Sequence, residues 1–304
     1  MRVTILSGGV GGARFTLGVL AAEPTAQVTV IANVGDDLEH WDLHVSPDVD
    51  TVLYTLSGRV GELGWGVRDD TRAAMGVVGE LGGADWFILG DRDVGLHLVR
   101  TARLRAGEPL SSIVADVAER LGVPARVLPA TDERLRTVME TAEGALPFQD
   151  WLVRRRAEPR VEAIRFEGAG AAPAPGVLAA IAEADRVLLA PSNPFISLDP
   201  ILAVAGIREA VVARRDEVVA VSPIIAGRAV KGPLGELLDS LGHERSALGV
   251  ARYLAPLAGT FLLDRQDALL KPAIEALGLR AVVADTLMQD PAVRAALART
   301  ALAA

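Results

Sequence analysis

The chain of 304 residues contains no cysteine, and aromatic residues make up only 4% of it. Without cysteine the protein has neither a disulfide nor a thiolate metal site, which is compatible with a reducing cytoplasm. Two tyrosines and six phenylalanines leave few rings for stacking on bases, and the formal charge of -8 provides no basic face for a phosphate backbone. Nucleic acid is therefore excluded as the expected partner.

Long apolar runs are also missing. No apolar segment approaches the ~20 residues that a membrane-spanning helix requires. The amino-terminal apolar run is broken by glycines and by Arg14, which does not fit a signal peptide. We therefore expect no membrane partner and a cytoplasmic location. Half of the residues are nevertheless apolar, so a chain of this length buries a sizeable core.

A glycine-rich turn stands near the amino terminus. Residues 7–14 read Ser-Gly-Gly-Val-Gly-Gly-Ala-Arg and directly follow a predicted buried strand at residues 3–6. Glycine lets the backbone approach a ligand closely, and the free amides at the start of the following helix attract anions. The turn predicts a phosphate-binding loop. A role in helix packing alone is less favoured, because four glycines in five positions cost conformational entropy that packing does not require.

The turn matches neither of the two familiar phosphate-binding motifs. A Walker loop requires Gly-Lys-Ser/Thr, which is absent here. The dinucleotide fingerprint requires a third glycine where this chain has Arg14, and an acid after the second strand where it has Asn33. A nicotinamide-dependent enzyme is therefore disfavoured.

Apolar segments typical of strands alternate with amphipathic helices, such as those predicted at residues 177–184 and 200–213. The strand-like segments are residues 28–31, 86–89, 187–190, 218–221, 261–263 and 281–284. This alternation predicts an α/β fold, a doubly wound and mostly parallel sheet covered by helices on both faces. We predict a single domain over residues 1–304, with a helix-rich elaboration at about residues 57–160.

Four carboxylates follow the second predicted strand and lie close to the glycine turn in sequence: Asp36, Asp37, Asp48 and Asp50. In open α/β sheets ligands bind at the carboxyl ends of the strands, so these acids are expected beside the phosphates, with oxygen ligands that suit Mg²⁺. Any single acid has an alternative role, since Asp50 or Thr51 also fits the cap of a helix. For the cluster as a whole a functional role is favoured.

Three further polar loops end predicted strands. Asp91 and, at helical spacing after it, His97 suggest a site for a second, polar substrate, although a single histidine is more often structural. The loops around Ser192 and Ser222, the latter leading to Lys231, suit recognition of a nucleobase or ribose. Ordinary turn chemistry remains the alternative for each loop.

Taken together, the motifs carry a resemblance to a known family. In chain order they read Gly-Gly-Val-Gly-Gly-Ala-Arg, Asn-Val-Gly-Asp-Asp, Ser-Pro-Asp-Val-Asp-Thr-Val-Leu-Tyr-Thr-Leu, Leu-Gly-Asp-Arg-Asp, Ser-Asn-Pro and Ser-Pro-Ile-Ile-Ala-Gly-Arg-Ala-Val-Lys-Gly-Pro. The chain resembles the 2-phospho-L-lactate transferase family of coenzyme F-420 biosynthesis over nearly its whole length. Ser46, where a cysteine is frequent, and Ile88, where a polar residue is common, are the departures.

The resemblance implies a Mg²⁺-dependent transferase with a Rossmann-like core, acting as a homodimer. Such an enzyme moves a phosphoenolpyruvyl or 2-phospholactyl unit from a guanosine-diphosphate-activated donor to the ribityl hydroxyl of the deazaflavin Fo and releases GMP.

The resemblance also assigns residues by position. The donor is expected at Gly8, Gly9, Gly11, Gly12, Arg14, Ser192, Asn193, Ser222 and Lys231. The acceptor Fo is expected at Asn33, Asp36, Asp50, Thr51, Asp91 and His97. Asp37, Asp48 and Asp50 are the candidate catalytic residues, with Asp48 and Asp50 as metal ligands.

Two other functions compete with this one. A non-catalytic regulator that binds nucleotide-linked metabolites would share the glycine-rich core, but it has little reason to keep Asp48 and Asp50 beside a phosphate. A Mg²⁺-dependent glycosyltransferase would use the same Asp-Val-Asp sequence as its metal motif.

Overall fold

A computed structural model describes all residues, 1–304, and confirms the α/β fold. Its centre is a seven-stranded sheet in which every pair of neighbouring strands is parallel. From edge to edge the strands are β14 (Arg280–Ala284), β13 (Thr260–Asp264), β10 (Val218–Val221), β9 (Arg186–Leu189), β1 (Arg2–Ser7), β2 (Gln27–Ala32) and β5 (Arg126–Pro129).

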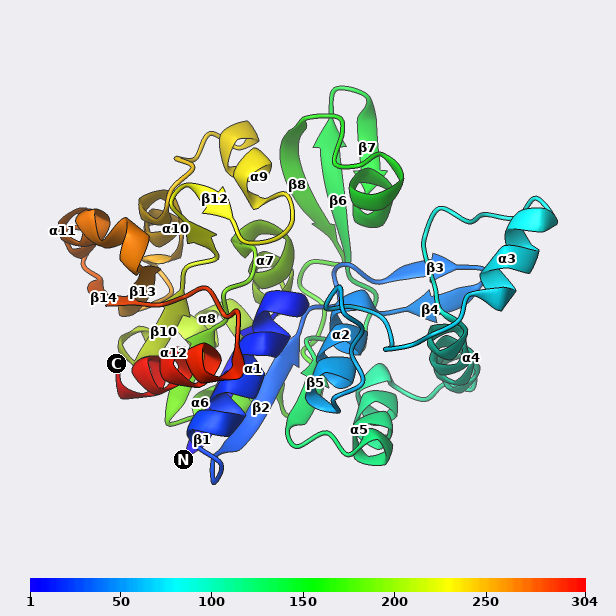
Figure 1. Cartoon of the computed structure of the whole chain (residues 1–304), viewed down its shortest axis with the longest axis horizontal. Helices are drawn as coiled ribbons and strands as arrows, with labels where there is room; N and C mark the ends of the chain where they lie inside the picture. Colours follow the sequence, from blue (N-terminus) through cyan, green and yellow to red (C-terminus); the bar gives the residue numbers. More distant parts are fainter.

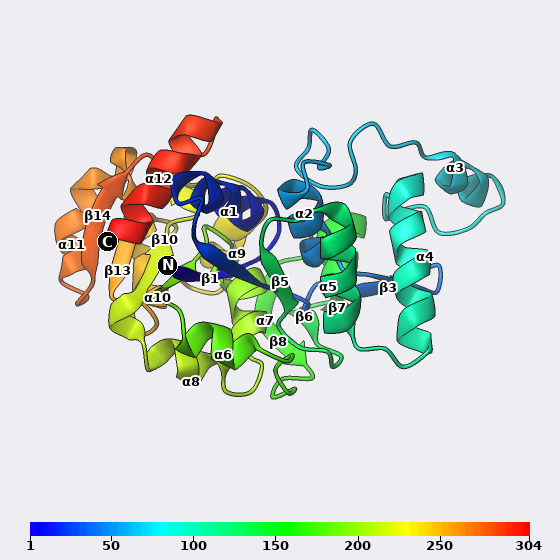
Figure 2. The same ribbon diagram turned by 90° about the horizontal axis from the view of Figure 1, so that it is seen from below.

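Helices cover both faces of this sheet, as Figure 2 shows. On one face lie α1 (Val10–Ala22), α2 (Pro47–Leu56), α5 (Leu110–Leu121) and α12 (Pro291–Ala303). On the other lie α6 (Val177–Ala182), α7 (Asp199–Leu202), α8 (Ile207–Val212) and α10 (Ala247–Leu254). The central strands are buried along almost their entire length, which explains why they read as continuous apolar runs rather than as an alternating pattern.

Strand order reverses beside β1. The chain first builds β1, β2 and β5 toward one edge, then returns to place β9 on the other side of β1 and continues outward to β14. Ligands of open α/β sheets bind at such a reversal, outside the carboxyl ends of the strands. The loops after β1 and β9 are therefore the expected walls of the site.

The region at about residues 57–160 contains α3 (Ala73–Glu80) and α4 (Asp91–Arg105), which project to one side of the molecule with the hairpin β3 (Leu38–His40) and β4 (Leu43–Val45) (Figure 1). Its segment 126–129 is strand β5 and completes the central sheet. A separate antiparallel sheet follows, formed by β6 (Arg136–Thr141), β7 (Gly144–Pro147) and β8 (Val161–Glu167). The division of the chain into domains stays a prediction.

Two predicted elements differ from the structure. Residues 86–89 form a loop rather than a strand, because no strand lies beside them and Ile88 is exposed. The helix predicted at residues 200–213 is two helices, α7 and α8, separated at Gly206, which has a φ of +78°.

The carboxy-terminal part completes the fold with the short pair β11 (Ile224–Ile225) and β12 (Arg228–Ala229), and with α9 (Leu234–Ser240) and α11 (Lys271–Glu275). Helix α12 begins directly after the Asp290 cap, whose carboxylate accepts bonds from the amides of Ala292 and Val293. None of the helices has the length and apolar character that crossing a membrane requires.

Candidate active site

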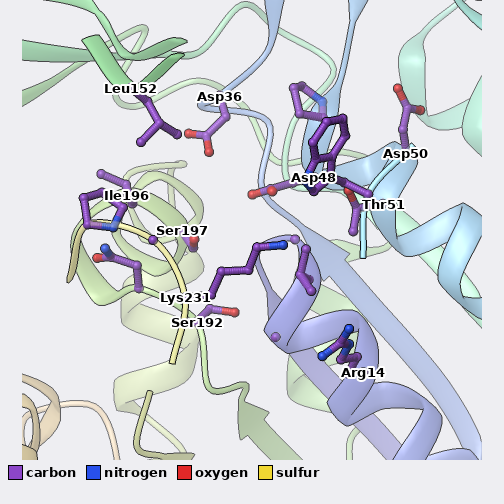
Figure 3. A pocket seen from close by; sticks show the side chains of 18 of the residues that line it. Arg14, Asp36, Asp48, Asp50, Thr51, Leu152, Ser192, Ile196, Ser197 and Lys231 are labelled. Atoms are coloured by element: carbon purple, nitrogen blue, oxygen red, sulfur yellow. The ribbon is translucent and has the colours of Figure 1, made fainter. Parts of the chain in front are cut away.

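A cavity of about 600 Å³ opens at the carboxyl ends of the strands. Twelve of the residues assigned from sequence line it: Gly9, Gly11, Arg14, Asp36, Asp48, Asp50, Thr51, His97, Ser192, Asn193, Ser222 and Lys231. Five do not: Gly8, Gly12, Asn33, Asp37 and Asp91. Residues from widely separated parts of the sequence thus meet in one space (Figure 3).

The glycine turn joins β1 to α1 and packs against the loop after β9. The amide of Gly8 donates to Ser192 Oγ over 3.1 Å. A Cβ atom added to Gly11 would lie 2.6 Å from the carbonyl oxygen of Pro191, which is backbone and cannot move aside cheaply. The absence of side chains therefore permits the two loops of the sheet reversal to meet, and the amino end of α1 faces the cavity.

Two cations stand beside this helix end. Arg14, on α1, and Lys231, on the loop before α9, both line the cavity. The Arg14 guanidinium makes no ion pair within the protein, and the pKa of Lys231 is lowered by partial burial and by the charge of Arg14. Two neighbouring positive charges with no acidic partner favour an anion at the amino end of α1.

Asp36 and Asp48 face the same part of the cavity. Figure 3 shows their carboxylates near one another, and the charge of Asp48 disfavours ionisation of Asp36. Burial raises the pKa of Asp48 to about 7, against the hydrogen bond that Asn33 Nδ2 donates to Asp48 Oδ2 over 2.9 Å. Burial, and then the charge of Asp48, raises the pKa of Asp36 well above its usual range. Asn33 thus positions Asp48 from outside the cavity.

Asp50 is arranged differently from Asp48. Its carboxylate accepts hydrogen bonds from both terminal nitrogens of Arg100, one of them over 3.0 Å, and both residues are buried. His97 Nδ1 lies 3.7 Å from Asp50 Oδ2. In Figure 3 the Asp50 carboxylate is turned away from that of Asp48. Arg100 therefore neutralises the negative charge of Asp50, the residue that the sequence analysis named as a metal ligand.

Asp37 and Asp91 have local partners outside the cavity. Asp37 Oδ2 accepts a hydrogen bond from Ser46 Oγ over 2.8 Å and lies 3.0 Å from His44 Nε2. Asp91 accepts bonds from the amides of residues 73 and 74 at the start of α3. Neither residue lines the cavity, and the roles assigned to them from sequence stay predictions.

His97 lines the cavity although it is almost wholly buried. Burial lowers its pKa to about 4, with the charge of Asp50 opposing this effect. The imidazole is therefore neutral at pH 7. Its Nδ1 has no hydrogen-bond partner.

The cavity has an apolar part that sequence reasoning missed. It is lined by Trp65, Phe87, Leu89, Phe148 and Leu152, together with the segment 286–289 before α12. These residues lie in irregular loops and short elements, where apolar side chains give no periodic pattern. No group of three or more histidine, aspartate or glutamate residues with the arrangement of a complete metal site occurs in the chain.

Comparison with known proteins decides the family. The sequence matches the family described as 2-phospho-L-lactate transferase CofD over residues 3–297. The chain belongs to this family. Among its relatives, a phosphoenolpyruvate transferase of Kitasatospora aureofaciens is 45% identical over 100% of this chain and 97% of the relative. A phosphoenolpyruvate transferase of Mycolicibacterium smegmatis is 40% identical over 99% of this chain and 98% of the relative.

Solved structures support the fold of this 2-phospho-L-lactate transferase family member. The crystal structure of protein BH3568 from Bacillus halodurans has a TM-score of 0.64 and 18% identity, covering 100% of this chain and 99% of the other. At that identity the likeness concerns the Rossmann-like fold alone. The family and the names of the relatives together support a transferase of coenzyme F-420 biosynthesis.

Proposed function

We propose that the protein transfers a phosphoenolpyruvyl unit from a guanosine-diphosphate-linked donor to the ribityl hydroxyl of Fo, releasing GMP. The observation that carries this proposal is the shared cavity, in which the amino end of α1, the unpaired cations Arg14 and Lys231 and the acidic pair Asp36 and Asp48 meet. Each of these three kinds of group can bind a diphosphate, the acidic pair through a divalent cation. The phosphoenolpyruvyl unit is preferred over 2-phospholactyl because the relatives at 40–45% identity are named phosphoenolpyruvate transferases.

The residues of the cavity fit a Mg²⁺ ion, with a revised ligand pair. Asp36 is buried and Asp48 is half-buried, both supply carboxylate oxygens, and Asp36 Oδ1 has no hydrogen-bond partner. Two close carboxylates that form no ion pair within the protein favour binding of a divalent ion. We propose Asp36 and Asp48 as the ligands, in place of the pair Asp48 and Asp50, because Arg100 already neutralises Asp50. When bound, Mg²⁺ neutralises negative charge on the diphosphate.

Other residues of the cavity bind the two substrates in this proposal. Amides of the glycine turn and Arg14 hold diphosphate oxygens, while Ser192, Asn193 and Ser222 line the nucleoside side. The apolar part of the cavity receives the deazaflavin ring. The ribityl oxygen forms a bond to the phosphorus that carries the enolpyruvyl group, the bond from this phosphorus to the GMP oxygen breaks, and the hydroxyl proton passes to water. Positioning and charge stabilisation suffice for such a transfer.

The decisive experiment incubates the protein with Fo, Mg²⁺ and a panel of donors that carry phosphoenolpyruvate, phospholactate or phosphoglycerate. With the phosphoenolpyruvate donor we expect a product with the mass of Fo joined to the phosphoenolpyruvyl unit through a phosphodiester. We also expect an equal amount of GMP. Binding of the donor without any product would support the regulator instead. Hydrolysis of a nucleotide sugar under the same conditions would support the glycosyltransferase.

The acidic pair predicts a pH dependence of Mg²⁺ activation. Because the pKa of Asp48 is about 7, this carboxyl holds a proton at pH 6 that a cation must displace, and is mostly ionised at pH 8. Lowering the pH from 8 to 6 is expected to raise the Mg²⁺ concentration for half-maximal activity by ~10-fold. Titrations of the initial rate with Mg²⁺ at both pH values measure this. An equal Mg²⁺ requirement at pH 6 and pH 8 would contradict it.

The family resemblance also predicts a homodimer in the cytoplasm. Sedimentation equilibrium at several protein concentrations tests the dimer, for which the expected mass is twice the 31.9 kDa of the chain.

A further inference from the structure

The turn at residues 61–66 has no role in the sequence motifs, yet it contacts the donor side of the cavity. Backbone hydrogen bonds of 2.9 Å, from Gly61 to the Gly66 carbonyl and from Gly64 to the Gly61 carbonyl, close the turn. A Cβ atom added to Gly64 would lie 2.7 Å from Val10 Cγ1 and 3.4 Å from Arg14 Nη2. The turn therefore packs directly against the first residues of α1.

Lys231 connects this turn to the opposite side of the cavity. Its Nζ donates a hydrogen bond of 2.7 Å to the carbonyl oxygen of Leu63, 168 residues away in the sequence. Figure 3 shows the Lys231 side chain extending toward the amino end of α1. An ammonium group has three N–H donors, so two remain for another acceptor. The nearby Arg14 guanidinium makes an anion the favoured acceptor.

We propose that the turn at residues 61–66 and Lys231 form a clasp over the donor. A diphosphate at the amino end of α1 takes the free N–H donors of Lys231 while the Leu63 carbonyl keeps the third. Donor binding thereby fixes the turn, whose Trp65 and Gly66 also line the cavity. The bound donor thus completes a wall of the space that receives the acceptor. This inference rests on the proposed function, because it takes a nucleoside diphosphate as the ligand.

The first test measures amide hydrogen exchange with GDP and Mg²⁺ as the probe. In the wild-type protein, saturating GDP is expected to slow exchange at residues 60–68 by ~5-fold or more, and also in the glycine turn. In Lys231→Met at saturating GDP, the glycine turn is expected to stay protected while residues 60–68 exchange as in the free protein. If Lys231 contributed only its positive charge, Lys231→Met would not lose protection at residues 60–68 while the glycine turn stayed protected.

A matched pair of glycine substitutions tests the clasp without removing any polar group. Gly64→Ala places a methyl group against Val10 and is expected to weaken GDP binding by ~10-fold. Gly58→Ala is the control, because Gly58 also has a positive φ, +71°, but has no atom within 4 Å of an added Cβ. Its GDP affinity, measured by calorimetry, is expected to equal that of the wild type.

The outcomes separate the two proposals. If GDP binds the wild type but leaves exchange at residues 60–68 unchanged, or binds Gly64→Ala as well as the wild type, the clasp is wrong and the proposed function stands. If GDP does not bind the wild type at all, the donor assignment fails and the clasp with it.

Discussion

Asp48→Asn is expected to lower turnover by ~100-fold or more, the range seen when a charged group that acts directly in a reaction is lost. Asp48 lies against the glycine turn, since a Cβ added to Gly9 would lie 2.6 Å from its Oδ1. The asparagine keeps the size of the side chain and an oxygen that accepts from Asn33. The variant therefore removes the charge while leaving the packing in place.

The measurement is the rate of product formation at saturating donor, Fo and Mg²⁺. Asp36→Asn is expected to show a loss of the same order, because the two carboxylates share the cavity. Asp199→Asn is the control, since Asp199 is a partly buried carboxylate that bonds Tyr253 outside the cavity. Turnover of Asp48→Asn within ~3-fold of the wild type would remove Asp48 from the acidic pair that we assign to catalysis.

Asp50→Asn is expected to act first on stability, because it leaves the guanidinium of Arg100 buried without a counter-charge. Arg100 is 1% exposed and Asp50 is 5% exposed. Loss of one partner from such a buried pair costs about 3–5 kcal/mol in the free energy of unfolding. For a chain of this size that corresponds to a fall of roughly 5–8 °C in Tm, measured by thermal unfolding under circular dichroism.

A double variant and an exposed pair provide the controls. Asp50→Leu combined with Arg100→Met removes both charges, and its Tm is expected to recover most of the loss, because no unpaired charge remains. Glu183→Gln removes the carboxylate that pairs with Arg2, and because these side chains are 63% and 53% exposed, no measurable change in Tm is expected. A Tm of Asp50→Asn equal to that of the wild type would show that the buried pair contributes nothing to stability.

The central sheet was predictable because most of its strands are buried on both faces. Apart from Thr29, residues 28–31, 187–190, 218–221, 261–263 and 281–284 are apolar, and each segment coincides with a strand of the parallel sheet. Segment 126–129 was not recognised as a sheet strand, because it is short and lies at the edge beside β2. Segment 86–89 carries the same apolar composition but has no strand to pair with, and composition alone does not distinguish the two cases.

The acidic cluster was predictable as a group but not in its pairing. Asp48 and Asp50 are two residues apart, which would place them on one side of a strand, but both lie in the first turn of α2. Residues two apart on a helix do not face each other, so only Asp48 points toward Asp36. The partner of Asp50, Arg100, comes from α4 and is 50 residues away.

Glycine spacing, apolar runs and ordered motifs are local properties of the chain, and they were enough to predict the glycine-rich turn, the parallel sheet and the family. The folded molecule was needed to see which carboxylates share the cavity, that Arg100 neutralises Asp50, and that Lys231 reaches Leu63. Each of these depends on the direction of a side chain and on a partner distant in sequence, and charge compensation and burial exist only once the chain has folded.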